Sequence, residues 1–351
     1  MIQFGNPAAL KYYSDEKVVE IKISKPTTNK STLDIICDQL VDVKKANVCL
    51  SGGLDSQFML RLAHRLGIST TAYTYLGLWN GSPINTDDYV YAQLSAKKLN
   101  IPLETIEIEL LDFFNNQQHL NYGKKYGLTS PQIAVHLHFL TLLKDIPGHM
   151  FVGGEMPILC KNSTQQEGPG DITNINPSFF IRNAFGYRKL AEEYNISLVK
   201  DIFLYTPEII YNTLQTSIDV VKKHKVHLEH FEHYPAYMHD HRVKYLILEE
   251  ILPGAIDPLY KSNGFEKLKK LLASVTGVYN QFDINYRKIM EEQHRKSMRS
   301  TTETISGATA SGVEGSVKFI AGNIPTEITE EFRKTITKYN SEPYLSYTFD
   351  F

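Results

Sequence analysis

One short segment of the sequence combines residue types that can hold a phosphorylated ligand. It reads Ser51, Gly52, Gly53, Leu54, Asp55 and Ser56. The two glycines allow the backbone to turn tightly and to bring amide N–H groups close to an anion. The two serines add hydroxyl donors, and Asp55 is placed where a carboxylate can bind the Mg²⁺ that neutralises phosphates. The segment therefore predicts a pyrophosphate cradle with a magnesium ligand.

The residues on either side of this segment predict a strand and a helix. Val48–Leu50 is apolar and runs directly into the glycines, and apolar residues then recur on one helical face from Leu54 to Leu66. A helix that starts here would aim its positive end at the bound anion. The segment lacks the lysine of the GxxxxGK[ST] loop and the third glycine of the GxGxxG loop, so it predicts neither of these.

Further strand and helix patterns alternate along the chain. Strands are expected at Thr70–Leu76, Leu103–Leu110 and Met150–Val152, and helices at 86–99 and from Ser130 to about Lys144. In the second helix Ser130 is a plausible cap and Pro131 suits the first helical position. Repeated units of this kind favour an α/β fold, a parallel sheet with helices on both faces, followed by a mainly helical region. Ligands of such sheets bind beyond the carboxyl ends of the strands.

Changes in composition divide the chain into five expected segments. They are an N-terminal entry segment at 1–46, the α/β domain at 47–177, a mainly helical substrate region at 178–298, a flexible linker at 299–316 and a C-terminal tail at 317–351. The entry segment should contain a strand at Lys17–Ile23 and a helix from about Ser31 to Lys45. The tail ends in Tyr344–Phe349, which could add an edge strand or dock on a partner.

The SGGLDS segment after an apolar strand resembles the signature of the ATP pyrophosphatase superfamily, which includes asparagine, NAD and GMP synthetases and several tRNA-modifying enzymes. The order of strands and helices extends this resemblance over about residues 47–160. Leu54 is typical of the branch that contains the synthetase domain of asparagine synthetases. The resemblance implies an adenine nucleotide alpha hydrolase-like fold, ATP and Mg²⁺ as cofactors, and release of AMP and pyrophosphate.

The segment from Phe151 to Glu155 is similar to the second loop of this family. The likeness implies that Gly153 and Gly154 contact the nucleotide and that Glu155 is a second metal ligand. Family members usually carry two acidic residues after the glycines, whereas methionine and proline follow Glu155 here. By the same resemblance, Tyr73 at the end of the second strand is expected near the adenine.

Cations follow the second loop in the sequence. Lys161, Arg182 and Arg188 could each stabilise the leaving pyrophosphate, because positive charge is needed where negative charge develops. We take Lys161 and Arg182, together with Asp55, as the candidate catalytic residues.

These features together predict an adenylating synthetase. A carboxylate or amide oxygen of a small-molecule substrate would attack the α-phosphorus, and a nitrogen nucleophile would then displace AMP. The 1–46 segment is too short for the amidohydrolase domain of glutamine-dependent family members. The nitrogen would therefore come from free ammonia, from a partner protein or from an amine of the substrate.

Two other functions stay open at this point. One is a sulfur or nitrogen transferase acting on adenylated tRNA or a nucleobase, with Cys160 carrying the sulfur. The other is a nucleotide-binding module without turnover. The histidine-rich stretch 224–241 could bind a metal or line a substrate pocket, whereas His136 and His138 should point to different faces of one helix.

Composition narrows the class of protein further. The 351 residues are 42% apolar and 22% charged, with a formal net charge of −2, which is typical of a globular cytoplasmic protein. No membrane segment is expected, because no apolar run approaches the roughly 20 residues that a spanning helix needs. The mixed charge gives no footprint for long nucleic acid, although a local basic patch could form on folding. The three cysteines show no CxxC pair.

Overall fold

The protein has a mixed α/β architecture in the computed structural model. The structure describes residues 19–24, 27, 29–51, 54–128, 130–153, 174–175, 178–200, 206, 208–209, 211–212, 215–216, 251–252, 319–320, 324–336 and 345–350. The expected linker at 299–316 and the histidine-rich stretch lie outside these residues. None of the helices in the described ranges is long and apolar enough to cross a membrane.

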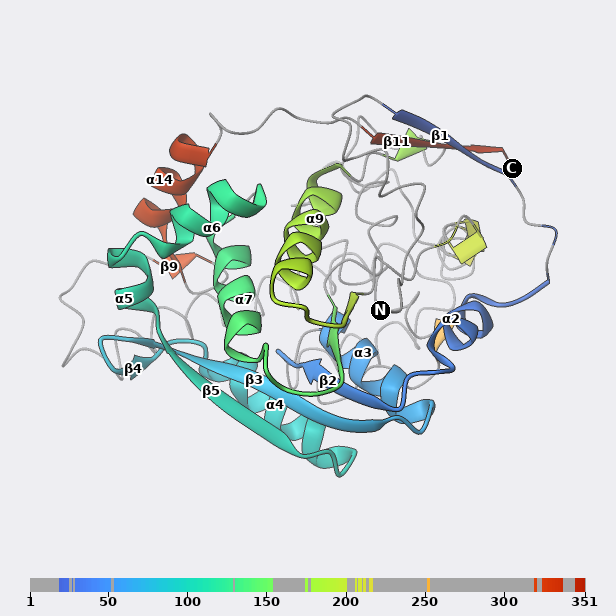
Figure 1. Ribbon diagram of the computed structural model, residues 1–351, viewed down its shortest axis with the longest axis horizontal. Coiled ribbons are helices and arrows are strands. Elements are labelled where there is room, and N and C mark those ends of the chain that lie inside the picture. The colour runs from blue at the N-terminus through green and yellow to red at the C-terminus, as the bar shows by residue number, and fades with distance from the viewer. Residues whose placement is uncertain are drawn as a thin grey trace, which may run out of the picture.

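A mostly parallel sheet of six strands forms the centre of the described part (Figure 1). Its strands are β2 (Lys45–Cys49), β3 (Ser69–Trp79), β4 (Ser82–Pro83), β5 (Leu103–Glu109), β6 (His149–Val152) and β8 (Leu198–Lys200). β5, β3, β2, β6 and β8 run parallel in that spatial order, and β4 pairs antiparallel with the end of β3. This is the doubly wound, Rossmann-like arrangement, and it confirms the expected fold class.

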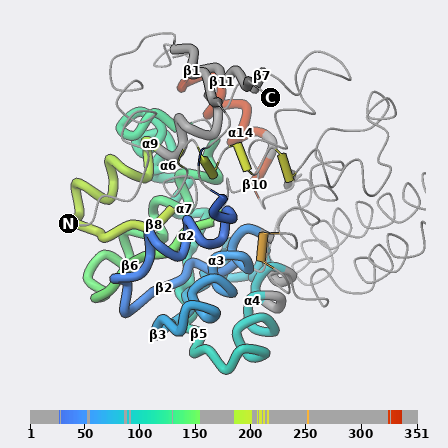
Figure 2. Tube along the Cα trace, turned by 90° about the vertical axis from the view of Figure 1, so that its right-hand side faces the viewer, coloured from blue at the N-terminus to red at the C-terminus, as the bar shows by residue number. Residues whose placement is uncertain are grey.

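Helices cover both faces of this sheet. They are α3 (Leu54–Arg65) and α4 (Thr86–Lys98) on one face, and α5 (Leu110–Asn115), α6 (Gln118–Tyr126), α7 (Pro131–Leu142) and α9 (Ser178–Glu193) on the other. The chain first adds strands on one side of β2 and then, from β6 onward, on the other side. Connections between parallel strands are right-handed, so the face that a connecting helix covers depends on the direction in which the next strand is added. The covered face therefore changes where that direction reverses. Figure 2 shows the two sets of helices on opposite sides of the strands.

Burial explains the sequence of the strands. In β2 the three residues Ala46, Asn47 and Val48 are all buried, as expected for the middle strand of a sheet covered on both faces. β5, at the edge, leaves several of its residues exposed. A large apolar cluster of the described residues lies between the sheet and the helices α5, α6, α7 and α9.

Two helix starts follow directly from their capping residues. Ser31 caps α2 (Thr32–Leu40): its Oγ accepts from Asp34 N, and the Asp34 carboxylate accepts from Ser31 N, which makes a capping box. Ser130 caps α7 as expected, with Pro131 in the first turn. The expected end of α2 at Lys45 is wrong, because the helix stops at Leu40 and Lys45 already belongs to β2. The chain needs these intervening residues to turn into the sheet.

The sheet continues past residue 177, where we expected the helical region to begin. This region does begin with a helix, α9, but the helix is followed by β8, which pairs with β6. A strand of three residues is too short to show a period in the sequence. The other segment boundaries stay predictions.

The two ends of the chain contribute a second, smaller sheet. β1 (Val19–Ser24) pairs in parallel with β11 (Leu345–Asp350), which also pairs antiparallel with β7 (Asn174–Ile175). This confirms the strand expected in the entry segment. The tail also forms a strand, but β11 lies between β1 and β7 and is not the edge strand that we expected. A further pair, β9 (Phe319–Ile320) and β10 (Ile324–Pro325), precedes the last described helix.

That helix, α14 (Thr326–Ile336), packs on α6 and α7, and the sequence did not predict it (Figure 1). Phe332 and Ile336 are each 1% exposed. They lie so close to Gly123 of α6 that a Cβ at Gly123 would be 2.7 Å from the Phe332 ring. The glycine therefore allows the tail helix to approach α6 closely.

A buried histidine lies at the contact between α6 and α14. His119 is 1% exposed, stacks on Phe332 with ring centroids 6.2 Å apart, and meets Phe114 edge-on at 5.1 Å. Neither of its ring nitrogens has a hydrogen-bond partner among the described residues. Burial lowers the pKa of His119 to about 4, so the imidazole is neutral at pH 7.

We expect His119→Phe to stabilise the protein by about 1 to 3 kcal/mol at pH 7, because it removes two buried polar atoms that lack partners. In the unfolded chain the His119 imidazole has its ordinary pKa of 6.5, whereas in the folded chain its pKa is about 4. The free energy of unfolding of the wild type should therefore decrease as the pH drops from about 6.5 to about 4. It should decrease less in His119→Phe, which lacks this imidazole. Urea unfolding at pH 7 and pH 5 measures both effects. His64→Gln, at an exposed histidine, is the control, and an equal acid sensitivity of wild type and His119→Phe would contradict the prediction.

Candidate functional site

The predicted phosphate loop lies at the carboxyl end of β2, directly before α3. Leu50 N donates to Tyr73 O at 2.8 Å, which extends the pairing of β2 and β3 to the start of the loop. Ser56, in the first turn of α3, is buried, and its Oγ accepts from Ser51 N at 3.2 Å. The hydroxyls of these two serines are also 3.2 Å apart. These contacts join Ser51 to the first turn of α3, so the N-terminus of α3 lies close to the carboxyl end of the strand. Gly52, Gly53 and the side chain of Leu54 are outside the described residues.

The second predicted loop starts in contact with the first. Gly153 follows β6, which is the neighbour of β2 in the sheet. A Cβ at Gly153 would lie 2.6 Å from the carbonyl carbon and oxygen of Asp55 and 2.9 Å from its Cβ. No larger residue fits unless the first turn of α3 moves. The structure thus brings Gly153 next to the first turn of α3, although the two are far apart in the sequence. Gly154, Glu155, Cys160 and Lys161 are outside the described residues.

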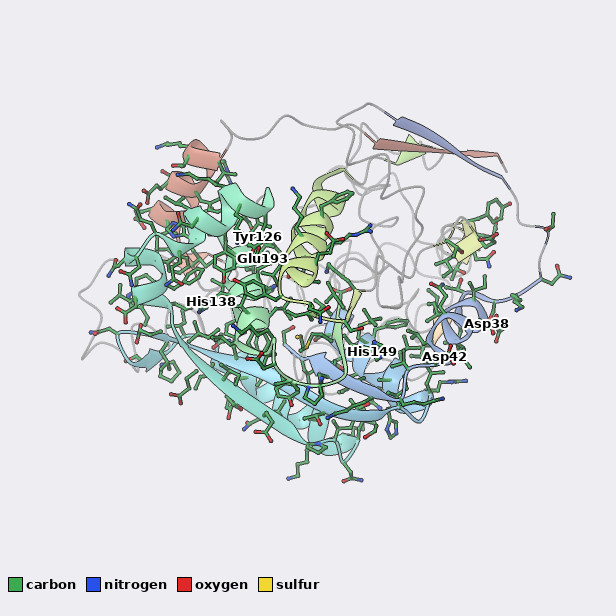
Figure 3. All side chains as sticks on the ribbon, in the orientation of Figure 1. Asp38, Asp42, Tyr126, His138, His149 and Glu193 are labelled. Carbon is green, nitrogen blue, oxygen red and sulfur yellow. The ribbon has the colours of Figure 1, made fainter. Side chains whose placement is uncertain are left out.

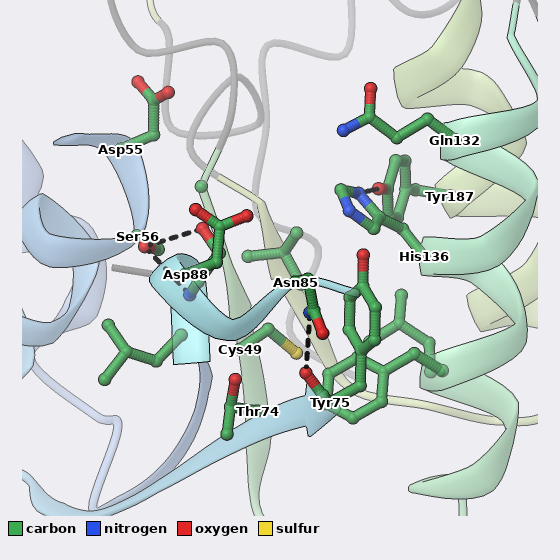
Figure 4. Close-up of a pocket in the computed structure, with 16 residues that line it drawn as sticks. Cys49, Asp55, Ser56, Thr74, Tyr75, Asn85, Asp88, Gln132, His136 and Tyr187 are labelled. Atoms are coloured by element: carbon green, nitrogen blue, oxygen red, sulfur yellow. Dashed lines mark hydrogen bonds between the residues drawn. The ribbon is translucent and has the colours of Figure 1, made fainter. Parts of the chain in front are cut away.

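A cavity of about 220 Å³ lies beyond these strand ends (Figure 4). It is located where the strand order reverses, between β2 and β6, which is where doubly wound sheets bind their ligands. Its lining residues are Cys49, Leu50, Ser51, Asp55, Ser56, Thr74, Tyr75, Asn85, Asp88, Gln132, His136, Phe139, Leu140, Val152, Gly153 and Tyr187.

Two carboxylates, Asp55 on α3 and Asp88 on α4, line one side of the cavity near Ser56 (Figure 4). Among the residues that the structure describes, no group of three or more His, Cys, Asp or Glu side chains could hold a metal by itself. Mg²⁺ usually keeps several waters and is held by one or two carboxylates together with substrate phosphates. The residues present therefore fit a magnesium ion that binds together with a phosphorylated ligand.

Asn85 fixes the position of α4 and hence of Asp88. Its Oδ1 accepts from Gly77 N at 2.8 Å, and its Nδ2 donates to Tyr75 O at 3.0 Å. Both partners belong to β3. The start of α4 is therefore anchored to the backbone of the strand, and Asp88 is held at the cavity by a rigid connection.

The opposite side of the cavity comes from α7 and α9. Tyr187 of α9 has its hydroxyl 3.3 Å from His136 Nδ1 of α7, and the His136 ring lies edge-on to Tyr75 at a centroid distance of 6.0 Å. Burial, assisted by the charge of Lys200, lowers the pKa of His136 to about 4. The imidazole is therefore neutral at pH 7. Gln132, one helical turn before His136, lines the same side.

A buried lysine lies directly behind this side of the cavity. Lys200, the last residue of β8, is 1% exposed. Its Nζ donates to Gly153 O at 3.3 Å and is 4.4 Å from the centroid of the Tyr187 ring. One cation thus contacts both the second loop and the α9 side of the cavity, where it can support the loop backbone and add positive potential near bound phosphates.

The comparisons with known proteins give little information beyond this geometry. No family model matches the sequence, and no curated protein matches it. Among solved structures, the chain is similar to a predicted subunit of tRNA methyltransferase from Methanocaldococcus jannaschii, with 14% identity over 50% of this chain and 75% of that chain. The TM-score is 0.29, and at this value the likeness carries no argument about fold or activity.

The structure places the other predicted site residues as follows. Tyr73 is not among the lining residues of the cavity, and β3 contributes Thr74 and Tyr75 instead. Arg188 Nε bonds Glu192 Oε1 at 3.0 Å within α9 and is not among the lining residues. The side chain of Arg182 is outside the described residues. The roles of Arg182, Lys161 and Glu155 stay predictions.

His138 and His149, which are labelled in Figure 3, are not among the lining residues of the cavity. His138 Nδ1 is 3.4 Å from the hydroxyl of Tyr122, so His136 and His138 do point to different faces of α7. His149, at the start of β6, lies 2.8 Å from Ser197 Oγ, at the opposite end of that strand from Gly153.

Burial raises the pKa of the Cys49 thiol to about 12. The thiol therefore stays protonated at neutral pH, although Cys49 lines the cavity. A protonated thiol does not supply the thiolate that nucleophilic attack needs, so we assign Cys49 a packing role in the cavity wall.

Sequence reasoning overlooked most of the α7 and α9 side of the cavity. Gln132 and His136 are polar residues four apart in a mainly apolar helix, and this spacing is a signal that could have been used. Tyr187 and Lys200 gave no comparable signal, because only the packing of α9 and β8 brings them to Gly153.

Proposed function

We propose that this chain is an ATP pyrophosphatase that activates a carboxylate or amide oxygen of a small molecule as an AMP adduct and then forms a C–N bond. The main support is the contact of Gly153 with the backbone of Asp55 at the point where the strand order reverses. Asp55 and Gly153, one described residue from each segment that the sequence resemblance assigns to pyrophosphate and metal, are adjacent there and line the cavity.

The residues of this site suit the proposed chemistry. The Ser51 to Ser56 loop and the N-terminus of α3 would bind the phosphates, and Asp55 would hold Mg²⁺, with Asp88 nearby. The bound Mg²⁺ would neutralise charge on the triphosphate. The acceptor oxygen forms a bond to the α-phosphorus, and the bond to pyrophosphate breaks with its electron pair on the leaving group. In the second step the nitrogen nucleophile forms the C–N bond, loses a proton, and AMP leaves.

The chain's contribution is mainly positioning and charge. Holding two reactants in line can supply a large part of the rate enhancement. Lys200 would support the loop that faces the phosphates, because its ammonium group holds the carbonyl of Gly153. Lys161 and Arg182 remain the candidates for direct contact with the leaving pyrophosphate.

The nature of the products tests this proposal. With α-labelled ATP and Mg²⁺, we expect AMP and pyrophosphate in equal amounts when the correct acceptor is present in a panel of carboxylates, amino acids, nucleobases and tRNA. EDTA should abolish both products, because the triphosphate would lose its counter-charge. Formation of ADP would refute the pyrophosphatase assignment, and dependence on tRNA or a nucleobase would favour the transferase class. Binding of ATP without turnover on any acceptor would favour a module without catalysis.

A further inference from the structure

The cavity has two chemically different sides. The side formed by α3 and α4 carries the serine hydroxyls of the loop and the carboxylates of Asp55 and Asp88. The side formed by α7 and α9 carries aromatic and aliphatic side chains together with Gln132, His136 and the Tyr187 hydroxyl. Phosphates bound at the N-terminus of α3 would leave the rest of a nucleotide to extend towards this second side.

The second side suits a planar ring. The Tyr75 ring lies 5.5 Å from the Phe139 ring at 54° and 6.0 Å from the His136 ring at 62°. Aromatic faces and edges of this kind favour the stacking of a heterocycle. A phosphate or carboxylate would lose its hydration there without gaining a charged partner among the described lining residues.

The following inference rests on the proposed function. We propose that the α7 and α9 side of the cavity binds the base of the nucleotide and that the His136–Tyr187 pair determines which base is bound. The pair links two helices through the 3.3 Å contact between the Tyr187 hydroxyl and His136 Nδ1. A base edge presents N–H donors and ring-nitrogen or carbonyl acceptors. A fixed, uncharged imidazole can distinguish these patterns, because a mismatched edge leaves a buried polar atom without a partner.

Lys200 connects this base-binding side to the phosphate side. Its ammonium group contacts both the ring of Tyr187 and the carbonyl of Gly153. Its positive charge also disfavours protonation of His136, which helps to lower the pKa of that imidazole. Burial is the main cause of the neutral form of His136, and the lysine that supports the second loop adds to it.

The test compares ligands that share the phosphates and differ in the base. We would measure the Kd values of Mg–ATP, Mg–GTP and Mg–tripolyphosphate by calorimetry for wild type, Tyr187→Phe and His136→Phe. Tyr122→Phe is the matched control, since Tyr122 makes a similar contact to His138 on the other face of α7. We expect wild type to discriminate between ATP and GTP. The two cavity variants should weaken Mg–ATP by about 5- to 10-fold, bring the ATP and GTP values closer together, and leave Mg–tripolyphosphate unchanged.

The outcomes separate this inference from the proposed function. Equal weakening of ATP and tripolyphosphate, or an unchanged ratio of the ATP and GTP values, would overturn the base assignment while the phosphate site stands. A wild-type protein that binds neither ATP nor tripolyphosphate would overturn the proposed function itself. Urea unfolding of each variant shows that a loss of binding is not a loss of folding.

Discussion

Asp55→Asn is expected to reduce pyrophosphate release by at least about 100-fold, while the fold stays intact. The side chain lies in the first turn of α3 and lines the cavity beside Ser56. An amide of the same size keeps the shape but removes the negative charge that Mg²⁺ requires. The loss should appear mainly in kcat and in the Mg²⁺ dependence, measured by a coupled pyrophosphate assay.

The matched control for this prediction is Asp112→Asn. Asp112 also occupies the first turn of a helix, α5, but it is exposed and is not among the lining residues. It should leave kcat and KM for ATP unchanged. If Asp55→Asn and Asp112→Asn behave alike, Asp55 does not hold the metal, and the magnesium site must be sought elsewhere in the chain.

Gly153→Ala should have the second large effect. The added methyl group would lie 2.6 Å from the carbonyl carbon and oxygen of Asp55, closer than real Cβ contacts. Because those atoms belong to the backbone of a helix, they cannot rotate away as a flexible side chain can. α3 and the loop after β6 must therefore move apart. A displacement of about 1 Å at a reacting centre can lower the rate by about 100-fold. We expect weaker Mg–ATP binding together with lower kcat.

Gly123→Ala distinguishes a site effect from a general packing effect. Its methyl group would clash with the side chains of Phe332 and Ile336 between α6 and α14, and these are not among the lining residues of the cavity. This variant should lower the free energy of unfolding with little change in the Kd of Mg–ATP. A Gly153→Ala protein with wild-type Kd and kcat would show that the two loops need not touch for the reaction.

The sequence was sufficient to predict the half of the site that depends on local structure. The Ser51 to Ser56 segment carries its own signals, because a strand, a glycine turn and a helix start follow one another within one unit. The parallel strands from β2 to β6 were predictable for the same reason. The place of the cavity then followed from a general rule about the carboxyl ends of parallel strands.

The other half of the site depends on contacts between elements far apart in the sequence. Lys200 reaches Gly153 only because β8 is added next to β6. Tyr187 reaches His136 only because α9 packs beside α7. Likewise, α14 lies on α6 because Gly123 leaves space for Phe332. Neither composition nor periodicity contains this information, so these residues could be found only in the folded structure.

The pairing of β1 with β11 has a consequence for the order of folding. Val19 is the partner of Leu345, whereas the strands of the central sheet pair with neighbours much closer in the sequence. During synthesis, β2 through β8 can assemble while β11 has not yet left the ribosome, and β1 must wait without its partner. The entropic cost of closing a loop also rises, though slowly, with the length of the chain between the paired strands. The small sheet should thus form last and open first, and hydrogen exchange should be faster in β1 than in β2.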